Sequence, residues 1–224
     1  MPADITYLGH SGFLFSDGTH TIAVDPFLTG NPAATHKPGE IRCTHIALTH
    51  GHPDHFGDTI EIARANNAPV FAAFEITEYL AEQGVANCEP GNPGGKIDAP
   101  FGSVAFTQAF HSSSYNGRYM GMPCGLVITI GGVTIYHCGD TALFSDMKLI
   151  GELYKPHVAC IPIGDRFTMG PAHAIRAAQL IAAPRAIPIH YNTWPPIEQN
   201  PADFNPPGVE VRIMQPGETW AVDA

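Results

Sequence analysis

Short apolar runs separated by turn signals organise the first part of the chain. Ile5 to Leu8 and Gly12 to Phe15 are rich in apolar residues, and the turn signal Asp17-Gly18 precedes a renewed strand pattern from Thr19 to Val24. After a loop-like stretch, a buried-strand pattern returns at His45 to Thr49. The elements expected next are a helix from Asp58 to about Asn67, a strand from Val70 to Ala73 and a helix from Glu75 to Gln83.

The second half repeats this layout without repeating the sequence. The expected strands are Ser103 to Phe110, Leu126 to Ile130, Val133 to Cys138, Val158 to Ile163 and Ala186 to Ile189, with a final hairpin from Val209 to Val222. The expected helices are Phe144 to Tyr154 and Pro171 to about Ala182. Two β-rich halves, each with helices on one face, favour a four-layer αββα sandwich, although the pattern alone supports only α/β or α+β.

Length and composition narrow the class of protein. At 224 residues and 44% hydrophobic content, residues 1–224 are expected to form a single domain with a sizeable core. The formal net charge is −10 and there is no basic run, which disfavours a nucleic-acid partner. The amino terminus resembles no secretion signal and no apolar run is long enough to cross a bilayer, so a cytoplasmic protein without membrane contact is expected. The five cysteines are widely spaced, which indicates free thiols rather than disulfides or a thiolate zinc site.

Histidine is the unusual residue of this composition, with 12 copies. Three imidazoles and one carboxylate fall within the six residues His50-Gly51-His52-Pro53-Asp54-His55, directly after an expected strand. Core packing does not explain such a density, whereas imidazole and carboxylate together suit zinc, iron or manganese. A tight loop would let His50 and His52 reach one ion while Asp54 and His55 reach a neighbouring one.

HGHPDH resembles the HxHxDH signature of metallo-β-lactamase-fold hydrolases. Later landmarks of that superfamily follow in order, each after an expected strand: His111 in AFHS, Asp140 in CGDT and His190 in PIHY. The segments LGHSGF, DPFLTGNP, MPCGLVITIGG, CGDTALFSDM and FTMGP further resemble a branch of small metal-dependent hydrolases (UPF0173-like). The resemblance covers essentially the whole chain.

This resemblance implies the αββα metallo-β-lactamase sandwich and a site for two divalent ions, zinc by default, with Mn²⁺ or Fe²⁺ as alternatives. One ion would be held by His50, His52 and His111, the other by Asp54, His55 and His190, with Asp140 bridging them. Asp54 is also expected to act catalytically, by orienting the attacking water or moving its proton.

Two further residues are candidates for supporting this site. His10, in LGHSGF, is expected to support a ligand or contact substrate, with an ordinary turn histidine as the alternative. Asp25 ends a strand before proline, so it either accepts a hydrogen bond from a ligating imidazole or caps the turn. His137 is expected to be structural, and His173 is given no role.

The function expected is hydrolysis of a small ester, lactone, amide or phosphodiester by metal-activated water, by a chain that could form homo-oligomers. A tRNA-processing phosphodiesterase is the main alternative, because such nucleases carry the same ligands. Pro171 stands where those nucleases would place a histidine, which weakens that reading. An iron-dependent redox variant and a ligand-free scaffold are further alternatives; the first needs a flavin domain, and the second is disfavoured because all seven ligand positions are intact.

Overall fold

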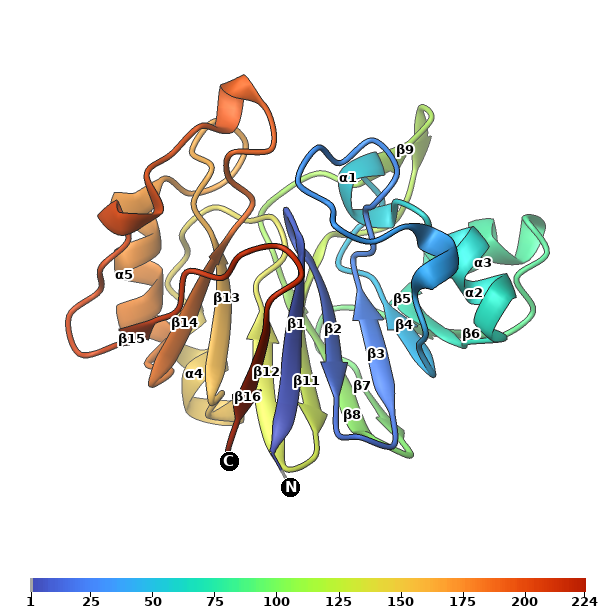
Figure 1. Ribbon diagram of the computed structural model, residues 1–224, viewed down its shortest axis with the longest axis horizontal. Helices are drawn as coiled ribbons and strands as arrows, with labels where there is room; N and C mark the ends of the chain where they lie inside the picture. The colour runs from blue at the N-terminus through green and yellow to red at the C-terminus, as the bar shows by residue number, and fades with distance from the viewer. Residues whose placement is uncertain (1) are drawn as a thin grey trace.

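A computed structural model describes residues 2–224, and its main feature is a pair of seven-stranded sheets placed face to face (Figure 1). The first sheet contains, in spatial order, β16 (Thr219–Val222), β1 (Ala3–Gly9), β2 (Gly12–Ser16), β3 (Thr21–Val24), β4 (His45–Ala47), β5 (Val70–Ala73) and β6 (Cys88–Gly91). The second contains β15 (Glu210–Val211), β14 (Arg185–Ile189), β13 (Val158–Pro162), β12 (Val133–His137), β11 (Cys124–Ile130), β8 (Gly102–Gln108) and β7 (Lys96–Ala99). A short hairpin of β9 (Ser114–Tyr115) and β10 (Arg118–Tyr119) stands apart from both.

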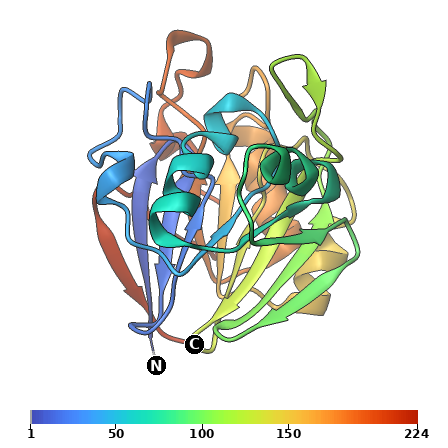
Figure 2. The ribbon, with the colours of Figure 1, turned by 90° about the vertical axis from the view of Figure 1, so that its right-hand side faces the viewer.

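Helices cover the outer face of each sheet. The helices are α1 (Pro53–Phe56), α2 (Thr59–Asn66), α3 (Phe74–Glu82), α4 (Met147–Tyr154) and α5 (Pro171–Ile181), with 3-10 turns at Pro38–Glu40, Pro195–Ile197 and Pro201–Asp203. In Figure 1, α2 and α3 lie on the right and α4 and α5 on the left, and Figure 2 shows α2 and α3 facing the viewer. The predicted four-layer αββα sandwich is confirmed.

Three apolar clusters account for this layering. Phe13 and Phe15 of the first sheet meet Phe106 and Leu126 of the second in the central cluster. A second cluster lies between the first sheet and α2 and α3, and a third lies between the second sheet and α4 and α5. Both sheets are thus buried on two faces over much of their length, which explains why several strands read as continuous apolar runs instead of alternating patterns.

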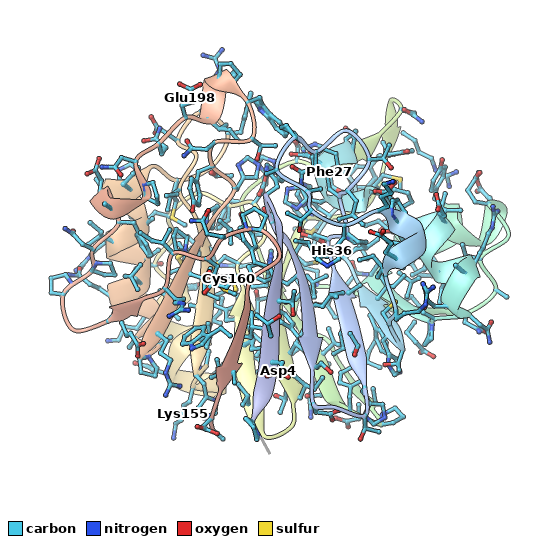
Figure 3. All side chains as sticks on the ribbon, in the orientation of Figure 1. Asp4, Phe27, His36, Lys155, Cys160 and Glu198 are labelled. Carbon is cyan, nitrogen blue, oxygen red and sulfur yellow. The ribbon has the colours of Figure 1, made fainter. Side chains whose placement is uncertain are left out.

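The strand directions place several loops at one edge of the sandwich. β3, β4, β5 and β6 are parallel to one another, as are β12, β13, β14 and β15. Because β1 is antiparallel to β2, which is antiparallel to β3, β1 and β3 run the same way; the same argument aligns β8 with β12. The carboxyl ends of β1, β3 and β4 therefore lie at one edge of the first sheet, and those of β8, β12 and β14 at one edge of the second. The two edges meet, because the His190 amide after β14 donates to the His10 carbonyl after β1. Figure 3 shows Phe27 near this upper edge and Lys155 near the opposite one.

The predicted hairpin from Val209 to Val222 is wrong. β15 pairs in parallel with β14 in the second sheet, whereas β16 pairs antiparallel with β1 in the first. The segment does contain two strands around a turn, but each buries its apolar side chains against a different sheet. Local alternation predicts that a strand exists and does not specify its partner, so the pairing was not available from the pattern.

Two other local predictions need correction. The metal-motif segment is only partly a loop, because Pro53–Phe56 forms one helical turn. The short edge strands β6 and β7 and the hairpin β9–β10 were not predicted. The five cysteines are free, as expected, and four of them are buried. Within residues 2–224, none of the helices has the length and apolarity needed to span a bilayer.

Candidate metal centre

The HGHPDH segment changes conformation midway, and this change sets where its side chains lie. His50 and Gly51 follow β4 in an irregular loop, and Pro53 then opens α1, where a proline with its fixed φ is well suited. A Cβ atom on Gly51 would collide with the Met120 side chain, so only glycine allows this loop to pack against the β9–β10 segment. The helical turn carries Asp54 and His55 back toward the same edge as His50.

One group of nitrogen donors contains His50, His52 and His111, whose ligand atoms all lie within 4.8 Å of one another. Nε2 of His50 is 3.0 Å from Nδ1 of His52, and the His52 and His111 ring centroids are 5.0 Å apart. His50 is fully buried, while His52 and His111 are partly exposed. The structure therefore brings His111, which follows β8, against two histidines that follow β4.

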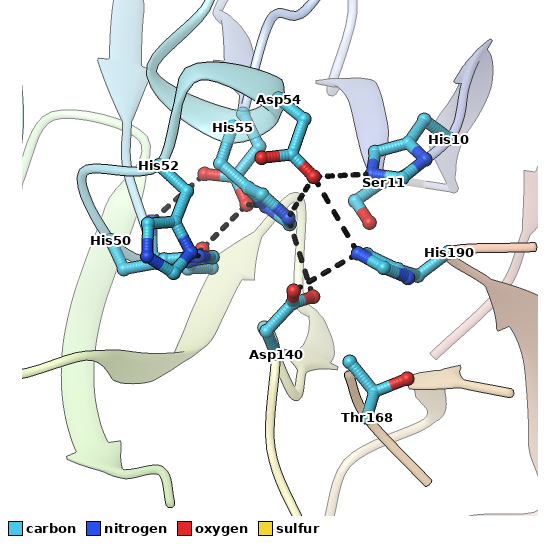
Figure 4. Close-up of polar contacts among 12 residues, drawn as sticks. His10, Ser11, His50, His52, Asp54, His55, Asp140, Thr168 and His190 are labelled. Carbon is cyan, nitrogen blue, oxygen red and sulfur yellow. Dashed lines mark hydrogen bonds and ion pairs between the residues drawn. The ribbon is translucent and has the colours of Figure 1, made fainter. Parts of the chain in front are cut away.

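A second group contains His10, Asp54, His55 and His190. Oδ2 of Asp54 lies 3.1 Å from Nε2 of His10, 3.6 Å from Nε2 of His190 and 3.8 Å from Nε2 of His55 (Figure 4). The three imidazoles are buried, whereas the Asp54 side chain is 22% exposed. His10 lies in the turn between β1 and β2, and its side chain is part of the cluster itself, in direct contact with Asp54.

Asp140, after β12, contacts both groups. Its Oδ2 is 3.0 Å from Nε2 of His190 and 3.5 Å from Nε2 of His111, and its Oδ1 is 3.3 Å from Nε2 of His55. Among the described residues, Oδ1 of Asp140 and Nε2 of His55 are buried and make no hydrogen bond. Buried polar atoms are rarely left so. Two such ligand atoms facing each other suit a cation, which both a carboxylate oxygen and an imidazole lone pair can bind.

Asp25 supports this cluster from behind. Its Oδ2 accepts hydrogen bonds from Nδ1 of His55 at 2.7 Å and from Oγ1 of Thr49 at 2.6 Å, and its Oδ1 accepts from the Thr49 amide at 2.8 Å. Because a carboxylate only accepts, Nδ1 of His55 carries the proton and the Nε2 lone pair points into the cluster. Asp25 thus contacts an imidazole of the cluster, the first of the two possibilities raised by the sequence.

His10 is held by a hydrogen-bond chain that starts at Thr193. Nε2 of His10 donates to Asp54, since the carboxylate can only accept, and Nδ1 then accepts from Oγ1 of Thr193 at 2.7 Å. Burial, followed by the neighbouring His190, lowers the pKa of His10 to about 4, so the ring is neutral. His10 has φ +58°, and its carbonyl accepts from the His190 amide at 2.8 Å. The loop after β1 is thereby joined to the loop after β14.

The electrostatics of the cluster favour positive charge at its centre. Burial alone would raise the pKa of Asp140, but His190 and His55 hold that pKa well below its usual range. Burial alone would lower the pKa of His190, yet Asp140 raises it to about 9. In the same way Asp140, then Asp25, raises the pKa of His55 well above its ordinary value. The carboxylates therefore attract either protons on these imidazoles or a cation in their place.

A cavity of about 490 Å³ opens above the cluster. Its polar wall includes Asp54, Asp140 and His190, and its other walls include Phe27, Phe167 and Trp194. Trp194 also packs against the ring of His10, with centroids 5.0 Å apart. A cavity with apolar walls and a few convergent polar groups is the usual form of a small-molecule site.

Comparisons with known proteins agree with this geometry. A family model described as a beta-lactamase superfamily domain matches residues 20–191. The chain is 51% identical over 223 residues to a UPF0173 metal-dependent hydrolase of Geobacillus thermodenitrificans, covering 96% of this chain and 98% of that relative. The chain belongs to the metallo-β-lactamase superfamily.

Solved structures also resemble this chain. Igni18, a metallo hydrolase from the hyperthermophilic archaeon Ignicoccus hospitalis, superposes with a TM-score of 0.91 at 36% identity over the whole of both chains. An isothiocyanate hydrolase from Delia radicum gut bacteria superposes with a TM-score of 0.79 at 20% identity over 99% of each chain, which shows the shared fold alone. This chain is a metal-dependent hydrolase of the metallo-β-lactamase superfamily.

Two further histidines discussed from the sequence, His137 and His173, lie outside the two groups of donors. His137 is buried, donates from Nε2 to the Ser11 carbonyl at 2.8 Å and accepts from the Gly139 amide at 3.1 Å, so it fixes the loop that carries Asp140. His173 lies on an exposed part of α5.

Sequence reasoning missed Thr193, Ser112 and Phe27. Thr193 holds His10, and the other two line the cavity. Their nearness to expected landmarks was visible in the sequence, but their side-chain contacts were not.

Proposed function

We propose that this hydrolase holds two divalent metal ions, zinc by default, in the two groups of donors that meet at Asp140. One ion would be bound by His50, His52 and His111, and the other by Asp54, His55 and His190. When bound, such ions acidify a shared water and polarise the oxygen of the bond to be broken. The observation that carries this proposal is the position of Asp140, whose two carboxylate oxygens contact imidazoles of both groups.

The donor set fits divalent ions by its chemistry. It combines imidazole nitrogens with carboxylates and contains no thiolate, as in catalytic sites of zinc, iron or manganese. Asp25 fixes the tautomer of His55, and carboxylate partners of this kind orient imidazole ligands in metal sites.

Asp54 is the residue to which we assign a catalytic role. It lines the cavity and is more exposed than Asp140, so its carboxylate can contact a water and a substrate as well as the cluster. Its pKa is lowered despite burial by His55 and by the hydrogen bond from His10, which keeps it ionised. In that state Asp54 can accept a hydrogen bond from the attacking water and orient it. The hydrogen bond from His10 helps to hold the Asp54 carboxylate in that position.

The cavity favours a small-molecule substrate. A volume of about 490 Å³ between Phe27, Phe167 and Trp194 suits an ester, lactone, amide or small phosphodiester. The formal net charge of −10 opposes a long polyanion. The proposed reaction is therefore attack of water on a small acyl or phosphoryl compound, with a nucleic acid as the less favoured substrate.

A direct test assays metal-reconstituted protein on p-nitrophenyl acetate, a simple lactone, p-nitroacetanilide and bis(p-nitrophenyl) phosphate, with bound metal measured in the same samples. We expect turnover of at least one class, lost on chelation and restored by metal. Assayed at metal concentrations that keep both sites filled, Asp54→Asn should lose about 10²-fold or more in kcat, whereas His173→Asn, on exposed α5, should match the wild type. Full activity of Asp54→Asn at full metal occupancy would disprove its role, and no turnover of any class by fully loaded protein would contradict the proposed function.

A further inference from the structure

Large apolar side chains that remain exposed are concentrated beside the candidate metal centre. In residues 2–224, eight large hydrophobic residues are exposed, and four of them are Phe110, Tyr119, Met122 and Phe167. Phe167 lines the cavity above the metal-binding cluster. The other three line a second hollow, described next. Single exposed apolar residues are common, but a group gathered at one place indicates a binding surface.

The second hollow has a volume of about 640 Å³ and adjoins the first. Phe110, Tyr119 and Met122 line it, and His111 and Ser112 line both hollows. We call it the side hollow. A molecule whose reactive group lies at the metal-binding cluster can therefore continue across His111 and Ser112 into the side hollow without passing through the protein interior.

One wall of the side hollow is fixed to the loop that carries the candidate ligands. Oγ of Ser113 accepts from the Gly51 amide at 3.1 Å, and the Met120 amide donates to the Ser113 carbonyl at 3.1 Å. Tyr115, in the adjacent hairpin, packs on Phe56 of α1 with ring centroids 4.7 Å apart. The segment from Ser113 to Met120 is thus attached to the metal-motif loop on two sides.

The wall formed by Phe110 is fixed to the loop that carries Asp140. The Phe110 amide donates to Oγ1 of Thr141 at 3.0 Å, and the Ala142 amide donates to the Phe110 carbonyl at 3.2 Å. The Phe110 ring also packs against Phe144, with centroids 5.2 Å apart. Both walls are therefore built from segments that position the cluster, and an apolar surface held in this way is prepared to receive a ligand.

We propose that the side hollow binds an apolar arm of the substrate, so that this enzyme acts on an ester, lactone or amide that carries an alkyl or aryl chain. This inference rests on the proposed function, because it places the reactive group at the metal-binding cluster. Phe110, Tyr119 and Met122 are then specificity-determining residues. They bind the arm and take no part in bond cleavage.

Binding of inert ligands tests the proposal separately from turnover. Metal-loaded protein would be titrated by calorimetry with alkyl hydroxamic acids from acetyl to octanoyl, whose head groups bind metal. Each added methylene that is half-buried should tighten binding by about twofold. Octanohydroxamate has six more methylenes than acetohydroxamate, so it should bind about 60-fold more tightly if all six are half-buried, and at least about tenfold more tightly if about four are. In the double variant Tyr119→Ser with Met122→Ser, this ratio should fall to about threefold or less. The control Leu153→Ser removes an equally exposed apolar residue on α4 and should keep the wild-type ratio.

The outcomes separate this inference from the proposed function. Failure to load metal, or no hydrolysis of any ester, lactone, amide or phosphodiester, would contradict the proposed function. A loaded, active enzyme with equal affinity for short and long hydroxamates, or with a long-chain gain unchanged in the double variant, would overturn the apolar arm alone. Sedimentation velocity tests whether a second copy of this chain fills the side hollow instead. A wild-type dimer that dissociates in the double variant would assign the side hollow to that second copy and overturn the proposal.

Discussion

Nδ1 of His55 lies 2.7 Å from Oδ2 of Asp25, and both side chains are fully buried. This contact joins the loop after β3 to the helical turn of the metal motif. It also places the His55 proton on Nδ1, which directs the lone pair of Nε2 toward Asp140. The orientation of one proposed ligand is therefore set by a residue 30 positions earlier in the chain.

Asp25→Asn should weaken metal binding while leaving most of the fold intact. The amide keeps the size of the carboxylate but offers one acceptor oxygen in place of two, so it cannot accept from His55 and twice from Thr49. We expect metal affinity to fall by about 10- to 100-fold and stability to fall by about 1–3 kcal/mol. Competition with a chromophoric chelator and urea unfolding measure the two effects.

An exposed carboxylate provides the control for this substitution. Asp98 is 82% exposed, and within residues 2–224 its only ion-pair partner is Lys96, which lies on the same strand. Asp98→Asn should leave both metal affinity and stability unchanged, because exposed ion pairs contribute little. Wild-type affinity in Asp25→Asn would show that the Asp25–His55 contact does not orient a ligand.

His10→Asn should impair the metal centre through Asp54. Asparagine tolerates the positive φ of this position, so the backbone can be retained while the hydrogen bond to Asp54 is lost. We expect affinity for the ion bound by Asp54, His55 and His190 to fall by about 10- to 100-fold, with a smaller loss in Thr193→Val. Metal titration monitored by calorimetry measures the loss of affinity. Two unchanged binding steps in His10→Asn would mean that Asp54 needs no such support.

Gly164→Ala should disturb the site from outside the ligand set. A Cβ atom there would collide with the His190 carbonyl and would lie 3.0 Å from Nδ1 of His190. Overpacking of this kind costs about 1–3 kcal/mol, and we expect lower thermal stability together with weaker metal binding. Gly39→Ala is the matched control, since nothing lies within 4 Å of its Cβ position. Equal behaviour of the two variants would contradict the close packing behind His190.

The sequence predicted where strands and helices lie along the chain better than it predicted which strands pair with each other. Strands and helices with strong local patterns were predicted to within a few residues, because each pattern reflects burial of the element itself. The strand Thr219–Val222 fills the edge of the first sheet beside β1, more than 200 residues away in the chain. Nothing in a local run specifies such a distant partner, and the predicted terminal hairpin failed for that reason.

Some residues of the candidate site could be predicted from the residue pattern alone, and others only from the resemblance. HGHPDH is dense enough in ligand side chains to indicate a metal site unaided. His111, Asp140 and His190 are single residues, and only the resemblance connected them. The structure brings all seven proposed ligands to one edge of the sandwich, but their roles as ligands stay predictions. The contact from His10 to Asp54 arises only because β1 ends beside α1, a relation between distant segments that the sequence does not state.

The most direct test of the central claim is the number of metal ions bound per chain, measured by elemental analysis after reconstitution with Zn²⁺ and removal of excess metal. The account predicts close to two equivalents for the wild type and close to one for His111→Ala, which removes a donor from only one group. A protein that binds no metal after reconstitution would contradict the account altogether. A single equivalent in the wild type, unchanged in His111→Ala, would contradict the two-ion centre.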